Sequence, residues 1–245
     1  MHRLLNTAAA ALIASATLPV PAAHAGAWGG IFSQINFTSD NRYQGNSNSD
    51  GHAAIYANVH YWRPDGWYAG LSAYQVDFND PGKTSYELDY YAGKNLKFDK
   101  GKTELKLEGM YTAFPDNKTW GPTYDFFQAK VGLKHTEGKL TLNAVTSFVP
   151  QASYGSGQAK RVDAEVAYQV TPKLTLNAGV GRRWIAKGQD RTYWNIGAAT
   201  TWKTLGLDVR YIDTNLSRRQ CGRFNPGICG PAVVGTLTVF LPPIL

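Results

Sequence analysis

Apolar and polar residues alternate along almost the whole chain after about residue 26, and hardly any segment has a helical period. A period of two is typical of a β-strand whose two faces meet different surroundings. The alternation predicts twelve strands of the length that a tilted strand needs to cross hydrocarbon, about ten residues. They lie approximately at 28–38, 51–62, 67–78, 85–98, 103–114, 124–135, 139–149, 161–170, 173–184, 192–202, 204–214 and 232–241.

The connections between these strands are of two kinds, which alternate along the chain. Tight turns are expected at 63–66, 99–102, 136–138, 171–172 and 203–204, and longer connections at 39–50, 79–84, 115–123, 150–160, 185–191 and 215–231. Short turns at one end and long loops at the other are typical of an up-and-down outer-membrane barrel. The polar stretch SDNRYQGNSNSDG at 39–51 is therefore predicted to be the first extracellular loop.

The alternation alone does not say which face lies inside, because a soluble barrel alternates too. A closed barrel of about twelve strands is wider than the eight strands that side chains can fill, which favours a polar, wet interior. The segment 103–114 shows the two faces, with Leu105 and Leu107 on one side and Lys106 and Glu108 on the other. Lys94 breaks the pattern, since it shares a face with apolar residues. It either snorkels to the lipid headgroups or marks a bulge.

The tryptophans give the second argument for lipid outside. All seven fall at predicted strand ends or in loops, as in the aromatic belts at the two membrane interfaces. The tight-turn end carries Trp28, Trp62, Trp67 and Trp202, and the long-loop end carries Trp120, Trp184 and Trp194. We therefore expect an all-β fold, a transmembrane antiparallel up-and-down β-barrel of about 12 strands that spans residues 26–245.

The first 25 residues are predicted to be a cleaved signal peptide. A positive start is followed by a short apolar stretch and by Ala23-His24-Ala25, a cleavage site of the small-x-small type. No later window is long and apolar enough to form a transmembrane helix. The net charge is +7, and in an exported chain this favours acidic headgroups or anionic solutes over nucleic acid. The predicted location is the bacterial outer membrane, with outer-membrane lipids as partners.

Charges of both signs fall on the polar faces and are expected to line the pore. They could select solutes, or they could form ion pairs that only fill a hydrated interior. The predicted pore-lining residues are Glu87, Asp89, Glu104, Lys106, Glu108, Lys130, Asp163, Glu165, Arg183, Asp208 and Arg210. The Arg182-Arg183 pair near the outer rim hints at anion attraction, although one of the two must face away.

Enzymatic activity is not expected. After the signal peptide the histidines are His52, His60 and His135, and none lies in a setting that suggests a nucleophile and its base. HExxH, GxSxG and phosphate-binding glycine motifs are missing from the sequence, so no cofactor and no metal site are predicted. Cys221 and Cys229 are close in sequence in an exported chain, and they are predicted to form a local disulfide.

Four blocks in order, SDNRYQGNSNSDG, GWYAGLSAYQVDF, YELDYYAGKNLKF and YIDTNLS followed by two cysteines, resemble the TorF-type family of proposed porins. The resemblance spans nearly the whole chain after the signal and implies an outer-membrane β-barrel. In the first block the family usually has Arg before the glycine and Gln after the serine, where this chain has Gln44 and Asn48. The family usually ends on an aromatic residue, whereas here the last strand must end before Pro242. Recognition by the barrel-assembly machinery would then use a signal that ends near Phe240.

These features predict a channel for passive diffusion of small polar solutes, with the loops 39–50, 150–160 and 215–231 gating the mouth. The rival interpretation is a non-conducting outer-membrane barrel that binds a partner or ligand through its extracellular loops.

Overall fold

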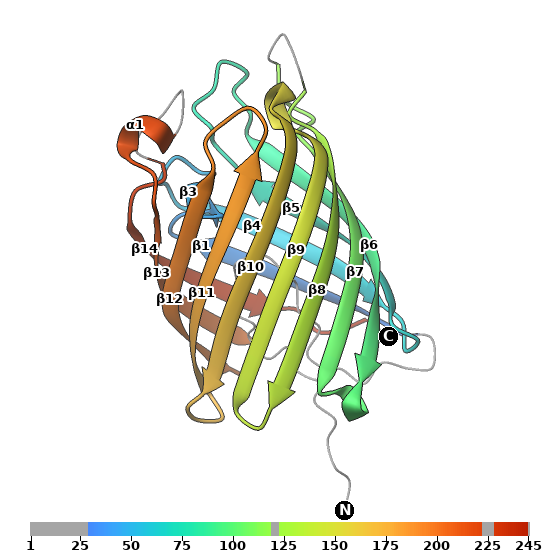
Figure 1. The fold of residues 1–245 in the computed structure, drawn as a ribbon. Coiled ribbons are helices and arrows are strands. Elements are labelled where there is room, and N and C mark those ends of the chain that lie inside the picture. Colours follow the sequence, from blue (N-terminus) through green and yellow to red (C-terminus); the bar gives the residue numbers. More distant parts are fainter. Residues whose placement is uncertain (1–28, 119–122, 222–227, 245) are drawn as a thin grey trace, which may run out of the picture.

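The computed structural model describes residues 29–118, 123–221 and 228–244. Twelve strands form a closed antiparallel barrel in which each strand pairs with its neighbours along the chain and β14 closes on β1 (Figure 1). The barrel strands are β1 Gly30–Thr38, β4 Ala54–Trp62, β5 Trp67–Gln75, β6 Tyr86–Phe98, β7 Thr103–Ala113, β8 Phe126–Glu137, β9 Leu140–Ala152, β10 Gly157–Gln169, β11 Leu174–Ile185, β12 Arg191–Trp202, β13 Leu205–Thr214 and β14 Ala232–Phe240. The predicted fold and its twelve strands are confirmed.

With the exception of the connection between β9 and β10, the connections alternate as predicted, with tight turns at one end of the barrel and longer loops at the other (Figure 1). A short 3-10 helix, η1 Asp99–Gly101, forms one of the tight turns, and the four-residue helix α1 Arg218–Cys221 lies in the last long loop. Among the described residues, no helix has the length and apolar character needed to span a bilayer.

The predicted loop at 150–160 is wrong. β9 continues to Ala152 and β10 begins at Gly157, so the 3-10 turn η2 Ser153–Gly155 and Ser156 alone join them. The register between β9 and β10 shifts at this point, and Pro150 lies within the irregularity. A bulge tolerates proline because its missing N–H is not needed for the regular ladder.

Lys94 also has a clear explanation. The pairings of β6 with β5 and β7 continue through Lys94 without a register shift, so the bulge alternative is wrong. Lys94 pairs with Trp67 at the tight-turn end, and its Nζ lies 5.0 Å from the centroid of the Trp67 ring. The ammonium group thus lies over an aromatic face instead of facing lipid tails alone.

The two faces of the barrel wall have the predicted orientation. Large apolar side chains such as Leu107, Leu133 and Ile196 are exposed on the outside, whereas Asn36 and Thr112 are fully buried inside. An exposed apolar surface around the whole barrel requires lipid, because water would make it costly. The chain is therefore an outer-membrane β-barrel.

The tryptophans follow the belt prediction in part. Trp67, Trp184, Trp194 and Trp202 are exposed at strand ends. Trp62, the last residue of β4, lies two positions after His60 and therefore shares the inward face of that strand, so its place in a belt stays a prediction. Whether the last side chain of a strand faces the lumen or the lipid is hard to predict when the strand bounds are unknown. Trp28, Trp120 and the predicted signal peptide lie outside the described residues.

The C-terminal strand ends at Phe240, before Pro242, as expected. The chain nevertheless continues along β1, where Leu241 N donates to Ser33 O and Ile244 exchanges two backbone hydrogen bonds with Ile31. The seam between the first and last strands is thereby extended past the two prolines.

Candidate functional site

The first long loop folds into the barrel mouth instead of standing out from it. It contains a small hairpin, β2 Arg42–Tyr43 and β3 Asn46–Ser47, which we call the mouth hairpin (residues 40–49). Gln44 and Gly45 both have positive φ, at 53° and 82°, as a two-residue hairpin turn of type I′ requires. Asp40, Gln44, Ser47 and Ser49 are buried. The stretch is the first of the long connections, as predicted, and it folds inward into the mouth.

Asp40 organises the mouth hairpin through its carboxylate. It forms an ion pair with Arg42 Nε at 2.6 Å and accepts hydrogen bonds from the hydroxyls of Ser47 at 2.5 Å and Ser49 at 3.2 Å. The same Ser47 hydroxyl accepts from the backbone N–H of Gly51. Short hydroxyl, amide and acidic side chains suit such a polar fold, which explains why this stretch needs almost no large apolar residue.

The tip of the mouth hairpin is docked on the wall formed by β10 and β12. Arg161 Nη1 donates to the Tyr43 hydroxyl at 2.9 Å, and Arg191 Nη2 donates to Gln44 Oε1 at 3.2 Å. At Gly45 a side chain would clash with Thr214 and Tyr193. Glycine is required there both for the turn and for this close approach.

The last long loop holds the other side of the hairpin. Ser47 N donates to Ile228 O at 2.7 Å, and Arg42 Nη1 donates to Gly230 O at 2.6 Å. Both carbonyls flank Cys229, which forms the predicted disulfide with Cys221. The disulfide loop therefore restrains the hairpin that lies in the mouth.

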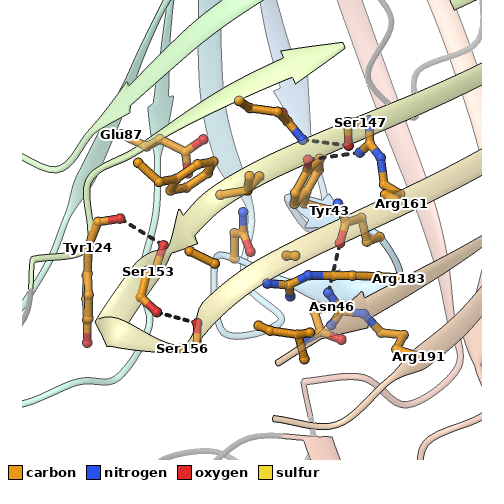
Figure 2. A pocket seen from close by; sticks show the side chains of 18 of the residues that line it. Tyr43, Asn46, Glu87, Tyr124, Ser147, Ser153, Ser156, Arg161, Arg183 and Arg191 are labelled. Atoms are coloured by element: carbon orange, nitrogen blue, oxygen red, sulfur yellow. Dashed lines mark hydrogen bonds between the residues drawn. The ribbon is translucent and has the colours of Figure 1, made fainter. Parts of the chain in front are cut away.

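A cavity of about 380 Å³ lies between the mouth hairpin and the barrel wall. Figure 2 shows Arg161, Arg183 and Arg191 gathered on one side of it, with Tyr124 and Ser153 across the space. The far side is largely apolar and includes a cluster of three rings. Phe78, Phe114 and Tyr124 pack edge to face, with centroids 5.6 to 5.9 Å apart.

Tyr124 closes the aromatic side with a polar anchor. Its hydroxyl donates to Asp80 Oδ2 at 3.1 Å, and Asp80 also accepts from the hydroxyl and the backbone N–H of Thr84. Burial raises the pKa of Tyr124 above its usual value, and the Asp80 carboxylate raises it further. The phenol therefore stays neutral, and its hydroxyl keeps donating a hydrogen bond to Asp80.

The three arginines occupy one register row across neighbouring strands. Arg161 of β10 pairs directly with Arg183 of β11, which pairs directly with Arg191 of β12. Like charges directly opposite each other in a sheet repel. Arg161 forms an ion pair with Asp163 at 2.8 Å, but Arg183 and Arg191 form none with any described residue. Arg191 Nε is buried without a hydrogen-bond partner among the described residues.

The predicted pore-lining residues all occupy inward positions of their strands, and most of those that form ion pairs do so with near neighbours. Glu108 binds Lys106 Nζ at 2.8 Å and Lys130 Nζ at 3.1 Å, and Asp208 binds Arg210 Nε at 2.7 Å. Asp163 also accepts from the Tyr193 hydroxyl, and Asp89 accepts from Thr112. Glu87, Glu104 and Glu165 face inward without an ion pair among the described residues. Glu87 lines the cavity.

Sequence reasoning missed Tyr43, Arg161 and Arg191 as cavity residues. Arg161 was the first residue of a predicted strand, Arg191 the last residue of a predicted loop, and Tyr43 lay in the predicted first extracellular loop. The only signal in the sequence was that these residues are arginine and tyrosine. The strand register that brings them together depends on how three strands pair, and the sequence does not show it directly.

The histidines do not form a hydrolase-like arrangement in the described part of the chain. The His60 ring stacks between Tyr68 and Tyr91, at centroid distances of 5.3 and 6.0 Å. His135 Nδ1 lies 2.9 Å from the Thr103 hydroxyl at the tight-turn end. His52 is exposed, and its ligand atom lies within 4.8 Å of those of Asp50 and Asp77. Exposed groups of this kind are common without a metal, so the expectation of no enzyme and no metal stays a prediction.

Solved structures with the same fold are outer-membrane porins and channels. The NanC porin has a TM-score of 0.57 at 10% identity, covering 84% of this chain and 98% of that one. The KdgM porin in complex with disordered oligogalacturonate has a TM-score of 0.55 at 8% identity, with coverages of 86% and 97%. An outer membrane channel from Pseudomonas putida F1 has a TM-score of 0.55 at 11% identity, with coverages of 87% and 96%. At these identities the similarity shows the fold alone.

In sequence, no curated protein matches the chain significantly. The family Gcw_chp, described as bacterial protein of unknown function, matches residues 23–226. This range includes the mouth hairpin, the three arginines and eleven of the twelve barrel strands, β1 to β13. The chain therefore belongs to the Gcw_chp family.

Proposed function

We propose that this protein is a porin-like channel for passive diffusion of small polar solutes across the outer membrane. The observation that carries the proposal is a closed twelve-strand barrel with an apolar outside and charged groups on the inward positions of its strands. A polar interior of this width suits water and solutes better than a dry core. The fold shared with the porins supports the proposal.

The mouth hairpin would set the width of the channel. It lies across the extracellular end and is held by the two arginine contacts and by the disulfide loop. Of the three gating loops expected from the sequence, the connections at 39–50 and 215–231 keep this role in the proposal. The segment 150–160 does not, because most of it is strand.

The inward charges would have two roles. Glu108 with its two lysines, and Asp208 with Arg210, neutralise each other and would hold the interior in place. In the arginine row, Arg183 and Arg191 form no ion pair with a described residue, and they would set the preference for anions over cations. Lipids of the outer membrane and the barrel-assembly machinery are the remaining partners that we infer.

Planar-bilayer recording of the purified barrel tests the proposal. A channel gives discrete conductance steps, and its reversal potential in a salt gradient shows a preference for anions. Replacing both Arg183 and Arg191 by Gln should move the reversal potential toward cation preference, whereas Arg182→Gln on the outward face should not. A folded barrel that inserts and stays electrically silent would contradict the proposal.

One observation favours a second candidate, a non-conducting barrel that binds a ligand in its mouth. The mouth hairpin is folded and buried within the mouth, so it could act as a permanent plug. Liposome swelling with neutral and charged sugars separates the two. If the intact barrel passes no solute and removal of the hairpin opens it, the second candidate holds; if the intact barrel already passes small solutes, the channel holds.

A further inference from the structure

We propose that the arginine row is the binding site for a solute carboxylate, and that the aromatic side of the cavity takes an apolar body attached to it. The substrate class is thus a small monocarboxylate with an aromatic or aliphatic body. This inference deepens the proposed channel function and rests on it for its biological meaning.

The arrangement of charge is the first reason. Arg161, Arg183 and Arg191 lie directly opposite one another on three neighbouring strands, which brings three guanidinium groups to one side of the cavity (Figure 2). Such a row is unfavourable in itself. An anion bound between two of the groups would remove the repulsion.

The unsatisfied donors are the second reason. Asp163 compensates Arg161, whereas Arg183 and Arg191 form no ion pair with any residue that the structure describes. Both side chains line the cavity, and the buried Nε of Arg191 donates to no described residue. A guanidinium group binds a carboxylate through two parallel hydrogen bonds, and this geometry is stronger than a contact with a neutral group. The present partner of Arg191, the Gln44 amide oxygen, is such a neutral group.

The opposite side of the cavity gives the third reason. Phe78, Phe114 and Tyr124 form the ring cluster, and Phe126 and Val149 continue the apolar lining. A pocket of this size with mostly apolar walls and a few convergent polar groups is typical of a small-molecule site. Acetate or chloride would leave this side without a partner.

Glu87 limits the charge of the ligand. It lines the same cavity and forms no ion pair among the described residues. A second negative group on the ligand would meet this carboxyl group and no further uncompensated arginine, so one carboxylate is favoured over two.

Titration calorimetry of the full-length barrel in a nonionic detergent tests the inference, with benzoate as the probe. Benzyl alcohol keeps the ring without the charge, and acetate keeps the charge without the ring. We expect saturable binding of benzoate, and at least about tenfold weaker binding of each comparison compound, in line with loss of a charge-assisted hydrogen-bond pair or of the ring contacts.

Variants of the arginine row are compared with a control at Arg182, which is adjacent to Arg183 but lies on the opposite face of β11. Arg183→Gln and Arg191→Gln should each weaken benzoate binding about tenfold, and Arg183→Lys should have an intermediate effect because the charge stays but the two-donor geometry is lost. Arg182→Gln is the matched control, since Arg182 is exposed over the Trp184 ring on the outside. The folded state of every variant is checked by the shift in gel mobility on heating.

Equal binding of benzoate and benzyl alcohol would overturn the inference, and so would an equal loss in Arg182→Gln and Arg183→Gln or a benzoate titration without saturation. The measurement does not depend on conduction. Saturable binding in a silent barrel would therefore support the site and contradict the channel, whereas conduction without binding would do the reverse.

Discussion

One row of inward-facing side chains around the barrel wall has two segments, one in which opposite charges neutralise each other and one that carries three arginines. On β7 and β8 the row holds Glu108 opposite Lys130, and Lys106 completes the neutralisation of Glu108. Ser147 of β9 follows, and the row then continues with Arg161, Arg183 and Arg191 on β10 to β12. We call these parts the balanced segment (Lys106, Glu108 and Lys130) and the arginine segment.

We expect the charges of the balanced segment to stabilise the barrel and those of the arginine segment to bind a solute. Removing one member of a compensated group leaves an uncompensated charge, so the balanced segment should matter for stability. Removing Arg183 or Arg191, which form no ion pair with a described residue, relieves repulsion within the row, so these two arginines should matter little for stability and more for what binds. The mouth hairpin is docked on the arginine segment.

The largest effect is expected when the mouth hairpin no longer docks. Replacing residues 41–48 by a short Gly-Ser linker should raise the single-channel conductance about threefold or more, because it removes the obstruction in the mouth. Gly45→Val keeps the chain length and should give a smaller rise, since its side chain would clash with Thr214 and Tyr193.

Bilayer recording measures both changes, with a shortened 186–190 loop as the control. Equal conductance of the linker variant and the unmodified barrel would show that the hairpin does not obstruct the path.

A smaller effect, on stability, is expected from Glu108→Gln. The free energy of unfolding should fall by about 3 kcal/mol, because two inward-facing lysines lose their carboxylate. Guanidinium unfolding of the barrel in detergent, followed by tryptophan fluorescence, measures the change. Arg183→Gln is the matched variant in the arginine segment and should leave the stability the same or slightly higher. Equal losses in the two variants would remove the distinction between the segments.

The smallest effect is expected from Tyr43→Phe, which deletes the hydroxyl that accepts from Arg161. A single hydrogen bond to a charged group contributes about 1.5 to 3 kcal/mol, so the hairpin should leave its docked position more often. The current should show more frequent openings, while the anion preference stays because no charge is removed. Tyr154→Phe, at an exposed position, is the control. A shift of the reversal potential in Tyr43→Phe would contradict the prediction.

The alternation of side chains was enough to predict the barrel, its strands and the facing of Glu108 or Asp208, because a period of two acts within each strand. The fold of the mouth hairpin was not predictable in the same way. A polar loop in outer water and a polar hairpin in a wet lumen have the same composition, and what distinguishes them here is the docking of Tyr43 and Gln44 on distant strands.

The remaining errors have equally local causes. Pro150 and the glycines near it indicate a turn, but a bulge absorbs the proline and the strands continue. Trp62 was placed at the tight-turn end from the sequence, but whether the last residue of a strand faces inward or outward depends on the exact strand bounds. The arginine segment depends on the pairing of three strands, and no single stretch of sequence contains that information.

The inward fold of the first loop also changes what the surroundings of the cell can touch. Antibodies, bacteriophages and proteases reach loops that stand out from a barrel, and residues 40–49 are largely hidden from them. Sequence differences between relatives in this stretch would then alter permeation. Selection by antibodies or bacteriophages would act mainly on the other extracellular loops.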